Sequence, residues 1–232
     1  MATFVAIAKN DISQEAWFSL NRHYKLRAGR TVLLSWAGTM FEYLMPCLWM
    51  NTYPDTLLDS AANEAVRAQR AYGDRKGVPW GISESASSQG AEEGDFAYYA
   101  FGIEALALRE SHPSALVISP YSTFLALHVG PKESLHNLRR MERSGWLGPY
   151  GMYESVDFVR ADGTWLPRPE IARIWMAHHQ GMSLLAIANS LCDGIVRRWF
   201  HRSPTVQSTE LLLQERPIAP ADLRPARLRV AA

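Results

Sequence analysis

Apolar residues recur at helical spacing through much of this chain. Between Leu57 and Tyr72 they fall three and four positions apart, opposite a charged and polar face. This period matches the 3.6 residues of a helical turn, so the segment predicts an amphipathic helix. We expect Asp55 to cap its start and Gly73 to end it.

Two other stretches predict apolar helices, and the first of them is buried rather than amphipathic. Between residues 39 and 50 the apolar side chains surround the whole helical cylinder, and Pro46 should kink or end the helix. Residues 174–189 form a second apolar helix with a polar beginning. Shorter helices are expected at residues 123–128, from Pro131 onward, and after the Ser203–Pro204 pair.

Strand patterns are scarce. A short β-like run covers residues 31–34, and residues 77–101 show no periodicity but are rich in glycine, serine, glutamate and aromatic residues. We interpret residues 77–101 as a long loop with a function, since a disordered segment would be poor in aromatic residues. The sequence therefore predicts a mainly α fold of antiparallel helix pairs, with functional loops at one end.

The composition is that of a globular domain. The chain has 232 residues, 47% of them apolar, and a formal net charge of +1. A nucleic-acid surface would require clustered basic charge, so we expect no nucleic-acid partner. No apolar run approaches the roughly 20 residues that span a bilayer. We expect the isolated chain to be soluble and cytoplasmic.

The two cysteines, Cys47 and Cys192, lie in apolar helical contexts without the spacing of metal ligands. We interpret them as two buried free thiols, which fits a reducing compartment.

Three stretches each place one glutamate among tryptophan, glycine, serine or tyrosine. Glu154 lies in residues 148–158, Glu42 in residues 35–44 and Glu84 in residues 79–85. Glycosyl transfer needs one carboxyl group as acid and a second as base or nucleophile, and aromatic rings cover the apolar face of a sugar. The shared pattern predicts one carbohydrate cleft. The alternative for residues 148–158 is an ordinary turn with a paired or capping glutamate.

The pair His178–His179, followed by Gln180, raises the alternative of a metal site. Adjacent residues point to different sides of a helix and no third ligand follows at i+4, so hydrogen bonding to a sugar or to a catalytic acid is favoured. The chain also lacks a serine-hydrolase elbow, a phosphate-binding glycine loop and a dinucleotide fingerprint. We expect neither a metal nor a cofactor.

Five blocks of sequence resemble the glycoamylase-like domain of bacterial cyclic β-1,2-glucan synthases. The resemblance extends from about residue 4 to residue 217. The blocks are LLSWAGTMFEYLMP (33–46), GVPWGISESA (77–86), YGMYESVD (150–157), MAHHQGMS (176–183) and ELLLQER (210–216).

This resemblance implies an (α/α)6 barrel, incomplete on its N-terminal side, that acts on β-1,2-glucan. Residues 1–217 would form the glycoamylase-like domain and residues 218–232 a tail rich in proline, alanine and arginine. Glu84 would match the acid/base and Glu154 the nucleophile of a retaining transglycosylation that closes the glucan into a ring, although the order of roles among these two and Glu42 stays open. The residues expected to shape the substrate subsites are Trp36, Trp80, Tyr150, Tyr153, Asp157, His178, His179 and Gln180.

Several alternatives accompany this reading. The chain could hydrolyse glucan instead of cyclising it, with retention or with inversion, or it could be an inactive fragment or a glucan-binding remnant of a synthase. As part of a parent synthase it would work beside other domains and be associated with the inner membrane.

Overall fold

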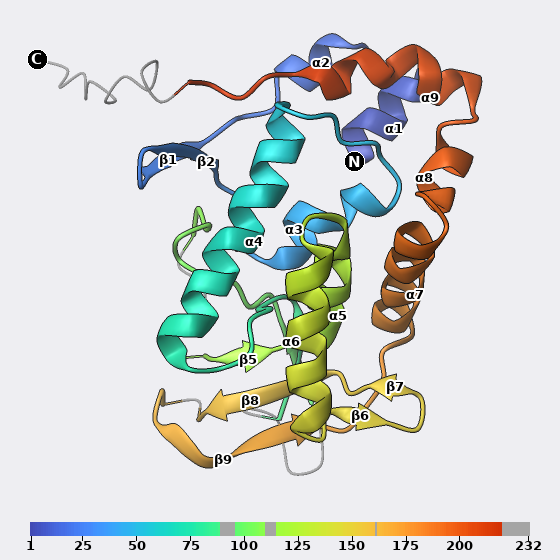
Figure 1. Ribbon diagram of the computed structural model, residues 1–232. Coiled ribbons are helices and arrows are strands. Elements are labelled where there is room, and N and C mark those ends of the chain that lie inside the picture. The colour runs from blue at the N-terminus through green and yellow to red at the C-terminus, as the bar shows by residue number, and fades with distance from the viewer. Residues whose placement is uncertain (89–95, 110–114, 161, 220–232) are drawn as a thin grey trace, which may run out of the picture.

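The fold was analysed in a computed structural model that describes residues 1–88, 96–109, 115–160 and 162–219 (Figure 1). Residues 89–95 of the expected loop, and residues 220–232 of the expected tail, lie outside the described residues.

Helices dominate the described part of the chain. The α-helices are α1 (Ala2–Ala8), α2 (Glu15–Phe18), α3 (Met40–Leu44), α4 (Leu57–Lys76), α5 (Pro120–Leu125), α6 (Pro131–Arg143), α7 (Ala177–Leu191), α8 (Ile195–Phe200) and α9 (Pro204–Thr209). Short 3₁₀ helices follow three of them: η1 (Pro46–Leu48), η2 (Ala126–His128) and η3 (Glu210–Gln214). The fold is mainly α, as the periodicity predicted.

Strands are more numerous than expected, but each is short. They are β1 (Tyr24–Arg27), β2 (Arg30–Leu33), β3 (Ser85–Ser87), β4 (Ala97–Tyr99), β5 (Val117–Ile118), β6 (Leu147–Gly148), β7 (Gly151–Met152), β8 (Ser155–Val159) and β9 (Trp165–Ala172). They pair antiparallel as β1–β2, β3–β4, β5–β8–β9 and β6–β7. The expectation of one unpatterned loop over residues 77–101 was therefore wrong, because β3 and β4 pair within it.

Helix α4 differs from its prediction at both ends. It begins after Thr56, which makes no side-chain cap, so the predicted Asp55 cap was wrong. It runs past Gly73 to Gly77, whose left-handed backbone (φ 71°) ends it. Gly73 is needed for a different reason: a Cβ there would lie 2.9 Å from the Cβ of Trp80. That glycine marks a close approach of the chain rather than a helix end.

The main core is formed by α3, α4, α5, α6 and α7 together with the three-stranded sheet. Met40, Leu106, Ile118 and Met141 are fully buried in it. In Figure 1 the sheet lies across one end of these helices, so that loops from several elements meet where helices and strands join. This junction holds the candidate site.

A second, smaller core joins the two ends of the described chain. Phe4 of α1 and Trp17 of α2 pack with Val206 of α9 and with Leu213. Arg22 forms a bidentate ion pair with Glu215, whose carboxylate oxygens lie 3.0 and 2.8 Å from the guanidinium nitrogens. Figure 1 shows α1 and α2 beside α9. These contacts tie the N-terminal helices to the C-terminal ones.

The cysteine prediction was half wrong. Cys47 is buried, and burial raises the pKa of its thiol to about 12, but Cys192 at the end of α7 is exposed. Among the described residues, no helix combines the length and the apolar character that a membrane crossing requires.

Candidate active site

Glu84 lies on a segment that is held from two sides. Gln69 of α4 clamps Ile82, since its side-chain amide donates to the Ile82 carbonyl and accepts from the Ile82 N–H, both at 2.9 Å. The hydroxyl of Ser83 accepts from the N–H of Phe41 in α3 at 3.0 Å. These bonds fix the backbone just before Glu84, so a rigid scaffold sets the position of its carboxyl group.

The carboxyl group of Glu84 is partly buried and is affected by the negative charge of Glu42. Burial raises its pKa above the usual range, and the charge of Glu42 raises it further, while His179 lowers it. A glutamic acid that keeps its proton nearer neutral pH can serve as a general acid. Of the three predicted glutamates, Glu84 has the environment of a proton donor.

Glu42 is a helix cap. Its carboxylate accepts from the Ser35 hydroxyl at 2.7 Å and from the N–H groups of Thr39 at 3.0 Å and Ala37 at 3.1 Å. With Thr39 it completes the capping box that begins α3. These bonds hold Glu42 in the scaffold, and its charge raises the pKa of Glu84. Its catalytic role stays a prediction.

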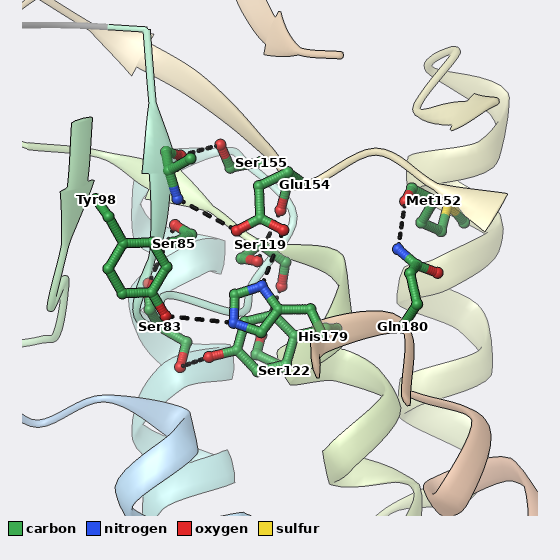
Figure 2. A network of polar contacts seen from close by, with 12 residues as sticks. Ser83, Ser85, Tyr98, Ser119, Ser122, Met152, Glu154, Ser155, His179 and Gln180 are labelled. Carbon is green, nitrogen blue, oxygen red and sulfur yellow. Dashed lines mark hydrogen bonds and ion pairs between the residues drawn. The ribbon is translucent and has the colours of Figure 1, made fainter. Parts of the chain in front are cut away.

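Glu154 is paired with a histidine inside the protein. Its Oε2 lies 2.8 Å from Nδ1 of His179, and its Oε1 accepts from the N–H of Ala86 at 3.2 Å (Figure 2). The exposed fractions of the two side chains are 0% and 1%. In this structure Glu154 is therefore out of reach of a sugar, which is not the open position that a nucleophile needs.

Two tyrosines bracket His179. The Tyr121 ring is stacked on the imidazole with centroids 3.7 Å apart, and the Tyr98 hydroxyl lies 3.4 Å from Nε2 (Figure 2). Burial raises the pKa of Tyr98 to about 12, and the charges of Glu84 and Glu154 add to this rise. Burial also raises the pKa of Tyr121, and the same two carboxylates add to this rise. The segment of Glu84 meets Glu154, 70 positions away, because Ser83 bonds the Tyr121 hydroxyl at 2.8 Å and Ala86 donates its N–H to Glu154.

His178 lies at the exposed side of this cluster. Its ring centroid is 4.0 Å from that of His179 and 6.3 Å from that of Tyr98. Burial and the neighbouring His179 lower its pKa, although Glu154 opposes this. A largely neutral imidazole at this edge can donate or accept a hydrogen bond from a sugar hydroxyl.

Asp157 is a structural acceptor in this structure. The side chain is fully buried on β8, where it accepts from the hydroxyl of Ser87 at 2.5 Å and from the N–H of Ser88 at 3.2 Å. Burial raises its pKa in spite of these bonds, which pull the other way. It ties the end of β3 to the sheet, and its place in a substrate subsite stays a prediction.

The two predicted tryptophans lie in different environments. Trp36 is 63% exposed beside the start of α3, with the guanidinium carbon of Arg109 at 5.8 Å from its ring centroid. Trp80 is only 7% exposed and packs against Gly73. Asn137 of α6 holds its backbone through bonds to its N–H and carbonyl. Trp80 is therefore packed in the core, and its role in a substrate subsite stays a prediction.

The β6–β7 hairpin carries an aromatic cluster of its own. Tyr153 and Tyr150 lie 5.0 and 5.2 Å from Trp175, measured between ring centroids. Tyr150 is 75% exposed. Gln180 donates to the carbonyl of Met152 at 3.0 Å and so supports the hairpin instead of facing the glutamates (Figure 2). The tyrosines remain available for ligand contact, whereas Gln180 has a scaffold role.

Sequence reasoning missed Gln69 and Tyr121, whose positions carry no motif, and it gave no role to Ser83 within the block 77–86. These residues become significant only because α4, α5 and the 80–85 segment meet. Tyr98 was noted as one of several loop aromatics, but its contact with His179 needs the β3–β4 pairing to bring it there. Within the ranges that the structure describes, no group of three or more potential ligands is arranged to hold a metal ion.

Comparison with known proteins places the chain in a family. The profile of the Glycoamylase family, described as "Putative glucoamylase", matches residues 1–204. The chain belongs to this family. It is also 40% identical over 223 residues to the cyclic β-(1,2)-glucan synthase NdvB of Rhizobium meliloti, an alignment that covers 96% of this chain and 8% of the synthase.

Solved structures agree on the fold of this glycoamylase-family chain. A protein of the same description from Bacteroides caccae has a TM-score of 0.57 at 22% identity. An endo-β-1,2-glucanase from Chitinophaga pinensis has a TM-score of 0.57 at 20% identity. Each comparison covers 83% of this chain and 46% of the solved chain. The chain thus spans less than half the length of these structures and a small part of the synthase.

Proposed function

We propose that this glycoamylase-family chain is a carbohydrate-active domain that acts on β-1,2-glucan. The observation that carries the proposal is that the segment of Glu84 is joined to Glu154. Ala86 donates to the Glu154 carboxylate, and Ser83 bonds Tyr121, which is stacked on the His179 partner of Glu154. The raised pKa of the Glu84 carboxyl group supports the role of an acid. The similarity to a β-1,2-glucan synthase supports the choice of substrate.

In the proposed reaction Glu84 protonates the glycosidic oxygen that leaves. Its raised pKa keeps a larger share of the acid protonated near neutral pH, which favours this step. Glu154 then acts as the second carboxylate, and a retaining mechanism would have it attack the anomeric carbon and pass the sugar to a hydroxyl of the same glucan chain or to water. Transfer to the same chain closes a ring, and transfer to water shortens the glucan.

Substrate would have to open the site before this attack. The Glu154 side chain has no exposed surface, and Tyr98, 45% exposed, is the outermost member of the contacts that lead through His179 to Glu154. A glucan that displaces the Tyr98 hydroxyl from His179 would begin to uncover the carboxylate. Trp36, Tyr150 and His178 offer exposed rings for the sugar units at the rim.

The covered state of Glu154 favours a second candidate function. A domain that binds glucan at its exposed rings without turnover would need no access to Glu154. Binding would then be independent of Glu84 and Glu154, whereas both carboxyl groups are required for the enzymatic function.

Incubation of the purified chain with linear β-1,2-glucan separates these functions. Chromatography and mass spectrometry would detect shortened glucans, or rings lighter than their linear counterparts by one water. We expect Glu84→Gln to abolish product, while Glu142→Gln, at an exposed position on α6, leaves it unchanged. Calorimetric binding without product supports the second function, and neither binding nor product refutes both for this chain. The anomer first released, followed by NMR, distinguishes retention from inversion.

Finer features of the architecture are part of the same proposal. The helices would belong to an (α/α)6 toroid, with residues 1–217 in the catalytic domain and residues 218–232 as a tail. In a longer synthase this domain would work beside other domains associated with the inner membrane. Limited proteolysis checks the boundary, since a stable core ending near residue 217 is expected.

A further inference from the structure

A cavity lies at the opposite end of α7 from the candidate active site. His179 is near the start of this helix, whereas the cavity is lined by Asn189 and Ser190 near its end. It has a volume of about 180 Å³ and is enclosed by η1, α5, η2, the start of α6, α7 and α8. The proposed glucan chemistry gives this cavity no role.

One wall of the cavity is cationic. Arg197 of α8 lines it, and within the described part of the chain no carboxylate lies within ion-pair distance of its guanidinium. Its neighbour Arg198, by contrast, is paired with Asp193 at 2.9 Å. The contacts of Arg197 are with neutral acceptors, the carbonyl of Cys47 and Nδ1 of His128, both at 3.3 Å from the same Nη1 atom.

His128 adds no positive charge to this wall. Burial and the neighbouring Arg197 lower its pKa to about 4, so the imidazole is neutral at physiological pH. Since Nδ1 accepts from Arg197, the proton lies on Nε2 and is donated to the hydroxyl of Thr52 at 2.7 Å. The histidine is thus satisfied and gives Arg197 no counter-charge.

The remaining polar side chains at the cavity are already used. Asn189 donates to the carbonyl of Leu48 at 2.9 Å and accepts from the N–H of Val196 at 2.9 Å. The hydroxyl of Ser190 donates to the carbonyl of Ala186 at 2.9 Å. The guanidinium, with five N–H donors and both contacts through one nitrogen, is the group with donors left for a ligand.

The cavity also has apolar lining residues, namely Leu48, Leu125, Leu127 and Pro131. A partly buried guanidinium is stabilised by a hydrogen-bonded anion, and its planar fork fits a carboxylate with two parallel bonds. Apolar side chains at the same cavity suit a short hydrocarbon. Arg197 and the apolar residues together favour a ligand with one charged end and one aliphatic end.

We propose that this cavity binds a small aliphatic carboxylate, with the carboxylate on Arg197 and the hydrocarbon against the leucines. The site is independent of the glucan function, because it shares no side chain with the Glu84 and Glu154 cluster.

Titration with acetate, butyrate and hexanoate at constant ionic strength, followed by calorimetry, tests this site. We expect saturable binding that tightens about fourfold for each buried methylene. Inorganic phosphate, which has no hydrocarbon, should bind more weakly than butyrate. Arg197→Gln keeps a hydrogen-bond donor but removes the charge, and should weaken butyrate binding at least tenfold. Arg198→Gln is the matched control and should leave binding unchanged.

A second variant tests the same site in case Arg197→Gln fails to fold. Ser190 is exposed at the cavity edge, so Ser190→Leu should block the cavity without touching the guanidinium. Loss of binding in this folded variant supports the site. The proposal is overturned by absence of saturable binding, by tighter binding of phosphate than of butyrate, by affinity that does not depend on chain length, or by undiminished binding in both cavity variants.

Discussion

The carboxylate of Glu154 and the imidazole of His179 meet at 2.8 Å in a space from which solvent is excluded. Glu154 comes from the turn between β7 and β8, and His179 from the first turn of α7. The backbone of Glu154 is fixed as well, since its N–H donates to Ile174 and its carbonyl accepts from Ser119. This pair therefore fastens the sheet to the helices at the point where the candidate site lies.

Removing the Glu154 carboxylate should destabilise the protein. Glu154→Ala leaves His179 and the N–H of Ala86 without their buried acceptor, and we expect a loss of about 3 kcal/mol in the free energy of unfolding. Glu154→Gln keeps the shape and one acceptor, so its loss should be about 1 kcal/mol. Urea denaturation measures both. Equal stability of Glu154→Ala and wild type would contradict the buried pairing.

Glu84 should behave in the opposite way. Because its pKa is raised in the folded protein, its charged form costs stability at neutral pH, and that cost disappears as the pH falls toward the ordinary value of 4.5. Glu84→Gln should therefore abolish glucan turnover while keeping or slightly raising the melting temperature at pH 7, by up to about 2 °C. The advantage should vanish near pH 4. Thermal melts at both pH values check this, and a clearly lower melting temperature at pH 7 would argue for a structural role.

The two tryptophans should separate binding from stability. Trp36→Ala removes an exposed ring, so glucan binding should weaken while stability changes by less than about 0.5 kcal/mol. Trp80→Ala removes a core ring and should cost about 3–5 kcal/mol. Calorimetry with glucan and chemical denaturation measure the two effects. A stable Trp80→Ala variant that no longer binds glucan would show that Trp80 contacts the sugar rather than supporting the core.

Two glycines offer a matched pair of alanine substitutions. A Cβ at Gly102 would lie 1.8 Å from the carbonyl oxygen of Ala37, so Gly102→Ala must shift the backbone and should cost about 3 kcal/mol or more. Gly181 is an exposed position in α7 with open space around its Cβ direction, and Gly181→Ala should stabilise by about 0.5–1 kcal/mol. Denaturant midpoints of the two variants should move in opposite directions.

His128 should make the protein sensitive to mild acid. Its pKa is about 4 in the folded protein and near 6.5 when unfolded, so the neutral form stabilises the fold above pH 6.5. That stabilisation, at most about 3 kcal/mol, is lost as the pH falls from 6.5 toward 4. Wild type should lose more stability over this interval than His128→Gln, as measured by urea denaturation at several pH values. Parallel pH curves for the two proteins would contradict the lowered pKa.

The periodicity of apolar residues was sufficient to predict the helices of the main core. Residues 57–76 show distinct apolar and polar faces, residues 177–191 are mostly apolar, and both segments form helices in the structure. The short strands were not predictable, because two- and three-residue pairings such as β3–β4 leave too brief a pattern. Asp55 likewise has the chemistry of a cap, but its backbone adopts φ 62° and the helix begins later.

Residue types and their local order were enough to predict the helical class, the family and the three acidic stretches. The surroundings of each acid follow from the packing of the folded chain: Glu42 caps a helix, Glu154 is buried against His179, and Glu84 has a partly exposed carboxyl group with a raised pKa. Exposure and hydrogen-bond partners decide these roles. Both depend on which distant segments pack together, and no local pattern contains that information.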